Sequence, residues 1–445
     1  MDVLVTSGQT CTGLNVARSL GRAGLRVLLG GATRASPGFA SRYVCGHFVY
    51  PSAARSPADF VEVLARQVER WRPRLVIPGD DSTLAALSQA AQRFAGRTRL
   101  ACPPFDVVRQ VLDKEATLAL SARLGIPTPL TVRLDRSRPV APQLDGFRFP
   151  VVLKPAAKFL DGQGVRFKAL FCREAAEVAR CLAELPPGEP GPLAQEYIAG
   201  TWVCVAALMG GGRPLAFFQY RPLQCLPPGG VGVRRVAEPV HPDLAGYLAR
   251  FLHALGWEGV AHAEFMVEDG VRPHIMDVNG RFWASIGLTL AAGMNFPVWL
   301  YRYLVEQEIP QPATYQGGVR CRWLVGELQR LEHFLRGRPG NDLRDRSSRV
   351  RALGDFLAGS FRAGHYDEFL WGDLRPGLRA LWQWGIGRWW WGLSGSSNGK
   401  APVPVPGFPA EAARASWPAA WGQAPGREED AAGAMSGVAP IGPRP

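Results

Sequence analysis

Lysine is scarce in this chain. Among the 51 basic residues of the 445-residue sequence, the lysines are Lys114, Lys154, Lys158, Lys168 and Lys400, and the others are arginines. The net charge of +13 therefore comes almost entirely from arginine, and a bias this strong says little about function by itself. Where a compact ammonium must contact a phosphate, however, arginine is a poor substitute, so the few lysines are informative.

Other patterns are missing as well, and each absence argues against a class of protein. The eight cysteines form no CxxC pair and no metal-type spacing, which disfavours a disulfide framework and fits a reducing cytoplasm. The N-terminus begins directly as a strand without a basic flank, so no signal peptide is predicted and the expected location is cytoplasmic. No base-reading motif is present, and we expect an anionic small substrate and a nucleotide as partners rather than nucleic acid.

The first part of the chain alternates between strand and helix patterns. A strand at 2–6, a tight turn at 7–13, a helix at 14–23 and a strand at 25–29 form a βαβ unit, with glycines where the backbone passes a helix N-terminus. The spacing is not GxGxxG, so a dinucleotide-binding oxidoreductase is only weakly indicated. A Rossmann-like domain without a dinucleotide is the alternative.

Asp80 and Asp81 follow another predicted strand, at 75–77. Ligands in open α/β sheets lie at the carboxyl ends of strands, so either carboxylate could hold a substrate ammonium. Plain helix capping is the alternative, and Asp81 or Ser82 could cap a helix that is predicted to run from Leu84 to Phe94.

The pattern with the most chemical content is a pair of short apolar runs on either side of Glu268–Gly270, a turn signal that predicts a β-hairpin. Side chains alternate along a strand, so Asp277, Asn279 and Arg281 share one face. Glu264 could lie on that face of the paired strand. Hard oxygen donors suit Mg²⁺ carried by nucleotide phosphates, and the guanidinium suits a phosphoryl oxygen. An exposed hairpin with solvated charges is the alternative, but the neighbouring residues are too apolar for a free surface.

Lys154 closes an apolar strand within residues 149–155, and a proline follows it at once. A buried ammonium needs an anionic partner, and a nucleotide phosphate would serve. The alternative is a lysine whose head reaches back to solvent. The next turn, at 161–165, contains Gly162 and Gly164 and could expose backbone N–H groups to phosphates, although glycine turns are common.

Residues 221–232 predict a long loop, and loops of this length are often functional or disordered. Arg221 begins this loop and the pair Arg234-Arg235 follows it. Their guanidinium groups could clamp a substrate carboxylate.

From about residue 311 the chain becomes rich in arginine and later in tryptophan. Residues 376–393 predict a helix that is too short and too charged to span a bilayer. Its tryptophans and arginines could lie in a membrane interface, bind a protein partner, or pack on the rest of the chain. Residues 394–445 are rich in Gly, Ala, Pro and Ser and are predicted to be disordered.

Taken in order, these motifs resemble the ATP-grasp superfamily, specifically its carboxylate–amine ligase and carbamoyl-phosphate-synthase-like branch. The resemblance covers roughly residues 1–310, and its five motifs are Asp113-Lys114, Gly125–Pro129, Val151–Pro155, Gln195–Gly200 and Asp277–Phe282. It implies an α/β protein built from several lobes. These are a Rossmann-like pre-domain at 1–112, a lid with its linker at 113–194 and a larger grasp lobe at 195–310, followed by the helical extension at 311–393 and the tail at 394–445.

The resemblance also implies roles for individual residues. ATP would lie between the lid and the grasp lobe, in contact with Lys114, Lys154, Gly162, Gly164, Gln195, Glu196, Tyr197, Ile198 and Arg281. Mg²⁺, or Mn²⁺ in its place, would be bound by Glu264, Asp277 and Asn279. Arg281 and Lys154 would act in the reaction, with Arg221 on the substrate. The chain departs from the family at Asp277, where glutamate is commoner, and at Trp202, where an acidic residue is common.

The implied function is that of an ATP-dependent ligase, which activates a carboxylate as an acyl phosphate and joins it to an amine, with release of ADP and phosphate. This chemistry needs no enzyme nucleophile, and the chain has no serine or cysteine elbow. A non-catalytic ATP-binding protein that docks to a membrane or partner through the Trp/Arg-rich segment is the main alternative. A biotin-carboxylase role is disfavoured because no biotinyl-carrier segment is present.

Overall fold

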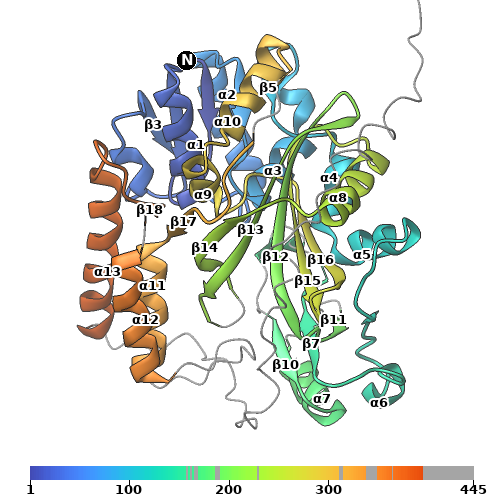
Figure 1. The fold of residues 1–445 in the computed structure, drawn as a ribbon. Helices are drawn as coiled ribbons and strands as arrows, with labels where there is room; N and C mark the ends of the chain where they lie inside the picture. Colours follow the sequence, from blue (N-terminus) through green and yellow to red (C-terminus); the bar gives the residue numbers. More distant parts are fainter. Residues whose placement is uncertain are drawn as a thin grey trace, which may run out of the picture.

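The structure is a computed structural model that describes residues 1–156, 159–160, 163–164, 169–185, 191–227, 230–309, 314–336, 348–362 and 364–393. Within these residues the strands form sheets of five, four and seven strands and one two-stranded hairpin (Figure 1). No helix of the described part is long and apolar enough to cross a bilayer.

The N-terminal sheet is parallel and has the strand order β3-β2-β1-β4-β5. Its strands are β1 (Val3–Val5), β2 (Val27–Gly31), β3 (Gly46–Val49), β4 (Leu75–Ile77) and β5 (Arg99–Leu100). The connecting helices are α1 (Cys11–Arg22), η1 (Pro37–Ala40), α2 (Pro57–Trp71), α3 (Asp81–Gln89) and η2 (Ala91–Phe94). A side chain at Gly13, in the first turn of α1, would bring its Cβ to 2.4 Å from the carbonyl oxygen of Ser7, so only glycine lets the helix start this close to the end of β1. The predicted βαβ unit is confirmed.

The start of α3 differs from the prediction. Asp80 is the N-cap, and its side chain accepts from the N–H of Thr83 while the Thr83 side chain accepts from the N–H of Asp80. The prediction that Asp81 or Ser82 caps a helix beginning at Leu84 is therefore wrong, because Thr83 completes a capping box with Asp80.

Two consecutive helices, α4 (Phe105–Leu112) and α5 (Lys114–Arg123), lead from this domain to the lid. The side chain of Asp113 accepts from the N–H groups of Glu115 and Ala116 at 2.9 and 3.1 Å and thereby starts α5. The predicted break at Asp113-Lys114 is confirmed, and it places Lys114 in the first turn of a helix, with its backbone N–H bonded to the carbonyl of Ala156.

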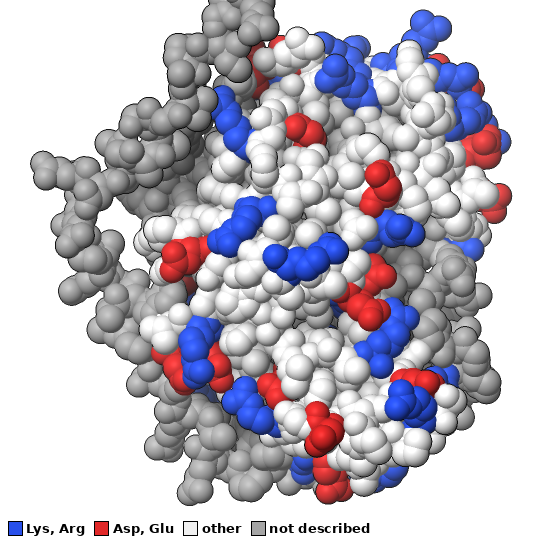
Figure 2. Space-filling view, turned by 90° about the vertical axis from the view of Figure 1, so that its right-hand side faces the viewer, with Lys and Arg blue, Asp and Glu red and all other residues white. Residues whose placement is uncertain are grey.

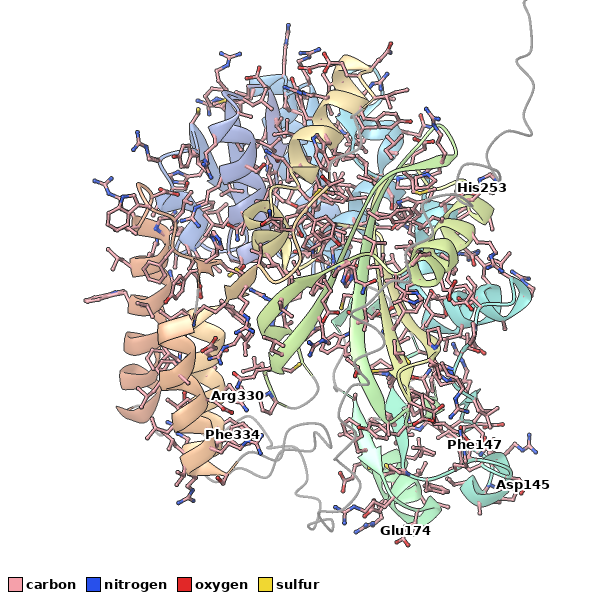
Figure 3. All side chains as sticks on the ribbon, in the orientation of Figure 1. Asp145, Phe147, Glu174, His253, Arg330 and Phe334 are labelled. Carbon is pink, nitrogen blue, oxygen red and sulfur yellow. The ribbon has the colours of Figure 1, made fainter. Side chains whose placement is uncertain are left out.

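The lid is a four-stranded antiparallel sheet with its own core. Its elements are β6 (Thr131–Arg133), α6 (Val140–Gln143), β7 (Val151–Lys154), β10 (Leu170–Cys172), α7 (Ala175–Glu184) and β11 (Leu193–Glu196). Between β7 and β10 in the sequence comes a separate hairpin of β8 (Phe159–Leu160) and β9 (Gln163–Gly164). Asp145, Phe147 and Glu174 lie at the outer end of the lid (Figure 3).

The seven-stranded sheet has the order β16-β15-β12-β13-β14-β17-β18. Its strands are β12 (Gly200–Gly210), β13 (Arg213–Cys225), β14 (Gly232–Glu238), β15 (Gly259–Glu268), β16 (Arg272–Asn279), β17 (Arg320–Arg322) and β18 (His365–Tyr366). Alternate side chains of the sheet point to its two faces. Those on one face pack with α4 and with α8 (Pro242–Ala254), and those on the other face belong to the core of the N-terminal domain. The large sheet and the N-terminal domain therefore share one hydrophobic core, whereas the lid has a separate core.

The prediction of a long loop at 221–232 is wrong. β13 continues to Cys225 and β14 begins at Gly232, so Arg221 lies in a strand. The pairing of β13 with β14 shifts register on either side of Gln224, next to Pro222. A proline is tolerated in a sheet at such an irregularity, and the sequence signal for a loop came from this proline and those that follow it.

The C-terminal extension does not stand apart from the rest. It contributes β17 and β18 to the large sheet, and its helices are α11 (Leu324–Leu335), α12 (Arg349–Arg362) and α13 (Arg375–Leu393). Before the extension, the helices α9 (Ile286–Ala291), α10 (Phe296–Tyr301) and η3 (Arg302–Glu306) follow β16. α13 packs against η1 of the N-terminal domain (Figure 1). The predicted disordered tail at 394–445 lies outside the described residues.

Candidate active site

The predicted β-hairpin is formed by β15 and β16, which pair antiparallel. Asp269 and Gly270 take positive φ angles of 50° and 72° at the turn. In the resulting register Glu264 lies directly opposite Asp277, and a bulge follows Glu264. Cross-strand partners point to the same side of a sheet, so the two carboxylates are neighbours, as the sequence indicated.

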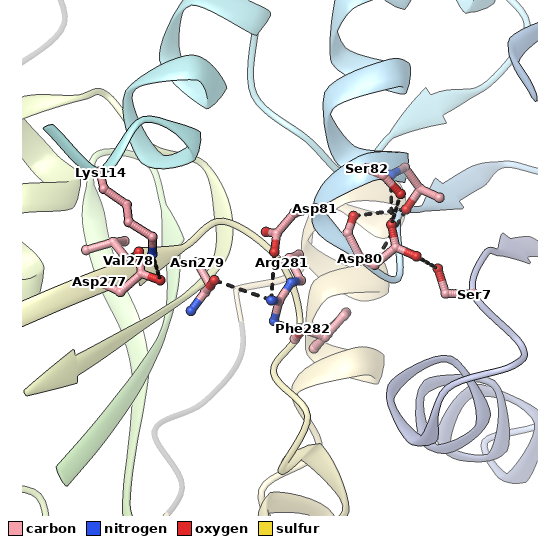
Figure 4. Close-up of polar contacts among 11 residues, drawn as sticks. Ser7, Asp80, Asp81, Ser82, Lys114, Asp277, Val278, Asn279, Arg281 and Phe282 are labelled. Atoms are coloured by element: carbon pink, nitrogen blue, oxygen red, sulfur yellow. Dashed lines mark hydrogen bonds and ion pairs between the residues drawn. The ribbon is translucent and has the colours of Figure 1, made fainter. Parts of the chain in front are cut away.

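Lys114 reaches these carboxylates from α5. Its Nζ lies 2.9 Å from Oδ2 of Asp277, and both side chains are largely buried (Figure 4). Burial opposes the ammonium charge, but the attraction of Asp277 and of Glu264 outweighs it, and the net effect is to raise the pKa of Lys114. Lys114 is therefore a permanent cation beside the acidic pair.

Arg281 connects the hairpin to the N-terminal domain. Its Nη2 lies 2.9 Å from Oδ2 of Asp81 and 3.3 Å from Oδ1 of Asn279 (Figure 4). Burial works against the guanidinium charge, yet the acidic neighbours, Asp81 first among them, leave the pKa of Arg281 raised. Of the two aspartates predicted as ammonium ligands, Asp81 faces this arginine, whereas Asp80 caps α3 and accepts from Ser7 Oγ at 2.5 Å.

Lys154 ends β7 on the lid side. Its Nζ donates to Oε1 of Gln195 at 2.6 Å, and Gln195 in turn donates to Oγ1 of Thr131 at 3.0 Å. The carboxylate of Glu196 points to Arg148, from which it accepts a backbone N–H at 2.8 Å. Gln195 therefore orients the Lys154 ammonium, and Glu196 holds Arg148, which lies just before β7.

Two cavities meet at the acidic pair. The first, of about 260 Å³, lies between the lid and the large sheet and is lined by Val152, Lys154, Phe171, Glu196, Tyr197, Ile198, Trp202, Met266 and Met276. The second, of about 310 Å³, extends toward the N-terminal domain and is lined by Asp81, Tyr220, Val231, His262, Asn279, Arg281, Trp283 and Ala284. Lys114, Glu264 and Asp277 line both. Lys154 and Glu264 therefore face the same space, as the sequence interpretation requires.

Tyr220, His262 and Trp283 are site residues that the sequence reasoning missed. The Tyr220 hydroxyl lies 2.9 Å from Nε2 of His262, and the His262 ring stacks on Trp283 with centroids 5.9 Å apart. His262 precedes Glu264 by two residues on β15, so strand alternation could have found it. Trp283 lies beyond the end of β16 at Asn279, where alternation no longer applies. Tyr220 could not be found in this way, because it comes from β13.

Two predicted substrate residues, Arg221 and Arg234, are not among the residues that line the second cavity. Arg221 pairs with Glu238 at 2.6 Å, and Arg234 binds Glu327 at 2.9 Å together with the carbonyl of Asp355. Arg235, also predicted to clamp the carboxylate, is buried and pairs with Asp367. All three guanidinium groups are thus engaged by the chain itself. Gly164 lies in β9, and Gly162 lies outside the described residues.

The site fits a metal that arrives with a nucleotide. Within the described residues, no three His, Cys, Asp or Glu side chains converge as a complete metal cage. Two carboxylates and one amide oxygen are present instead, from Glu264, Asp277 and Asn279. Mg²⁺ is usually held in this way, by one or two carboxylates, with phosphate oxygens and water as its other ligands.

A lid sheet and a larger, mainly antiparallel sheet that enclose a cavity, with a Rossmann-like domain before them, define the ATP-grasp fold, and this chain has it. Solved structures with the same fold include an L-amino acid ligase from Bacillus licheniformis (TM-score 0.54, 15% identity, 70% of this chain and 77% of that one). Others are the N5-carboxyaminoimidazole ribonucleotide synthetase from Thermus thermophilus (0.53, 18%, 72% and 81%) and a biotin carboxylase from Campylobacter jejuni (0.56, 12%, 72% and 74%).

Sequence comparison adds no nearer relative. No protein-family description matches the chain, and no curated protein is similar to it in sequence. At identities below 20% the structural likeness establishes the fold, and function has to be argued from the site.

Proposed function

We propose that the protein is an ATP-dependent ligase that activates a carboxylate as an acyl phosphate and joins it to an amine. The observation that carries this proposal is the meeting of two cavities at Lys114, Glu264 and Asp277. Such an arrangement allows a phosphoryl group to pass from a donor in one cavity to an acceptor in the other. The ligase and synthetase among the structural neighbours are in keeping with this class of reaction.

ATP would occupy the cavity between the lid and the large sheet. Apolar side chains form its opposite walls, with Val152 and Phe171 on the lid and Met266 and Met276 on the large sheet, and a flat purine suits a slot of this kind. The N–H groups of Glu196 and Tyr197 are bonded to the carbonyls of Leu130 and Pro150. We therefore expect the N–H of Ile198 to contact the adenine edge.

The polar end of this cavity would hold the phosphates. Lys154 and Lys114 approach from the lid and from α5, and both are compact cations suited to phosphate oxygens. Glu264, Asp277 and Asn279 would hold Mg²⁺, which neutralises charge on the phosphates when bound. On ATP binding we expect Lys114 to exchange part of its contact with Asp277 for a phosphate oxygen.

The second cavity would hold the carboxylate. Its oxygen attacks the γ-phosphorus, ADP leaves, and the acyl phosphate that results has a good leaving group. Arg281, which lines this cavity, would stabilise charge on the transferred group, and such stabilisation is the main catalytic requirement of phosphoryl transfer. The amine then attacks the acyl carbon and phosphate departs, with loss of a proton from the nitrogen. The stacked rings of His262 and Trp283 form a closed wall on this side.

The test is a screen for ADP release with Mg-ATP over amino acids and other small carboxylates, with and without an added amine, followed by mass analysis of the products. We expect ADP release that depends on a carboxylate and a product whose mass equals that of an amide. Nucleotide binding without turnover across the screen would instead favour the non-catalytic alternative. A thermal shift caused by NAD(P) would favour the oxidoreductase.

Asp81 offers a sharper test of the assignment of the two cavities. It lines the second cavity only and holds Arg281. We expect Asp81→Asn to lower kcat for ADP release about tenfold, since a charged partner of Arg281 is lost, and to leave the KM for ATP unchanged. Asp59→Asn, in the first turn of α2 and away from both cavities, is the matched control. A large rise in the KM for ATP would show that the cavities are wrongly assigned.

A further inference from the structure

The C-terminal extension carries an exposed apolar ridge. Trp371, Leu374, Leu378 and Trp382, hereafter the α13 ridge, are 92%, 43%, 58% and 68% exposed. Leu378 and Trp382 are four residues apart on α13 and so lie on one face of the helix, and Leu374 comes four residues before Leu378, immediately before the helix begins. Trp371 precedes them at a tight turn in which the N–H of Asp373 bonds the carbonyl of Leu370, with Gly372 at a φ of 85°. Large exposed apolar groups that line up in this way mark an interaction surface.

The ridge is held firmly in place. Asp373 is buried and accepts from Nε of Arg18 at 2.8 Å, from Oγ of Ser41 at 2.6 Å and from the N–H of Arg42 at 2.9 Å. Elsewhere on α13, Arg379 donates to the carbonyl of Arg34 at 2.6 Å, and Gln383 donates to that of Ala35. One face of α13 therefore packs on the N-terminal domain, and the other presents tryptophan and leucine outward.

The exposed charged residues of the ridge segment and of the N-terminal loop on which it packs are basic. Arg34 and Arg42, from the N-terminal domain, and Arg375, from α13, are exposed, and Arg379 lies beside them. Among the described residues of 367–385 the acidic ones are Asp367, Glu368 and Asp373, and all three are buried. By contrast, the face drawn in Figure 2 carries acidic and basic side chains interspersed.

We propose that the α13 ridge docks the protein on an anionic lipid surface. Tryptophan is enriched at the boundary between headgroups and acyl chains, where its ring is partly apolar and its N–H is polar. Arginines beside an apolar helix face add attraction to anionic headgroups, and such a helix lies in the plane of the interface. A protein partner would need an apolar groove with acidic residues placed to match the same arginines.

The test is sedimentation of the full chain with vesicles of two compositions, equal parts phosphatidylcholine and phosphatidylglycerol, and phosphatidylcholine alone. We expect binding to the anionic vesicles that weakens with salt and little binding to the neutral ones. The double variant Trp371→Ser/Trp382→Ser should bind anionic vesicles about tenfold more weakly, because it loses the apolar contact. Arg34→Glu/Arg375→Glu should lose binding as well.

Matched controls separate the ridge from surface effects in general. Leu130→Ser/Val271→Ser removes two exposed apolar side chains elsewhere, and Arg66→Glu/Arg123→Glu reverses two exposed charges on α2 and α5; neither should alter binding. Circular dichroism of each variant checks the fold. The proposal is overturned if the wild type ignores anionic vesicles, if the ridge variant binds as well as the controls, or if the wild type is a dimer that the ridge variant converts to a monomer.

Discussion

Replacing Glu264 by glutamine is expected to lower the rate of carboxylate-dependent ADP release about a hundredfold to a thousandfold, the range seen when one charged or hydrogen-bonding group is removed from a transition state. Glu264 lines both cavities and faces Asp277 across the hairpin, so its charge acts where the phosphoryl group would be transferred. Lys154→Met should have an effect of similar size, because it removes the lid ammonium from the nucleotide cavity. Coupled-assay measurement of ADP gives the rates.

Glu268→Gln is the matched control for Glu264→Gln. Glu268 lies on the same strand and the same face, four residues further on, and it faces Arg272 and His274 outside both cavities. Its substitution should leave ADP release within about twofold of the wild type, because Glu268 lines neither cavity. If ADP release that depends on a carboxylate survives both Glu264→Gln and Lys154→Met, the assignment of this site to phosphoryl transfer is wrong.

Arg18→Ala is expected to destabilise the fold by about 3–5 kcal/mol, because it leaves the buried carboxylate of Asp373 without its charged partner. Arg18 and Asp373 lie 2.8 Å apart with side chains almost wholly inaccessible. Arg18 also donates to the carbonyls of Asp367 and Glu368 at 3.1 and 2.8 Å, so a single side chain of α1 holds the turn before α13. The free energy of unfolding, from urea titration followed by tryptophan fluorescence, measures the loss.

Arg22→Ala, one helical turn further along α1, is the control for this prediction. Arg22 is exposed, and its removal should change the free energy of unfolding by less than about 0.5 kcal/mol. A double-mutant cycle with Asp373→Ala would isolate the pairwise energy, since removal of both partners leaves no unpaired buried charge. Equal stability of the Arg18→Ala and Arg22→Ala variants would mean that the pair does not hold the extension to the domain.

The hairpin at the centre of the site could be predicted because its information is local. Alternation along a strand is fixed by backbone geometry, and a turn signal at Glu268–Gly270 leaves few ways to pair the flanking runs. The facing of Glu264 and Asp277 follows from these two facts, and the structure confirms it. The predicted ATP-grasp fold is confirmed as well, whereas the individual roles assigned to the site residues stay predictions.

The partners of the arginines could not be predicted. Arg221 and Arg234 were expected to face a substrate, but a guanidinium pairs with whichever carboxylate the fold brings within reach. Here these are Glu238 and Glu327. The loop predicted around them was wrong for a related reason: prolines signal a loop locally, and only pairing with β14 shows that the strand continues past Pro222.

The sequence by itself determined the local features: the hairpin with its acidic pair, the lysine at the end of β7, and the break before Lys114. Each depends on backbone periodicity or capping within a few residues. Only the tertiary structure decided that Asp81 holds Arg281 across 200 residues, that Arg18 holds Asp373 across 355, and that one face of α13 stays exposed. The reason is that contacts of this kind depend on how whole layers pack, which no local pattern encodes.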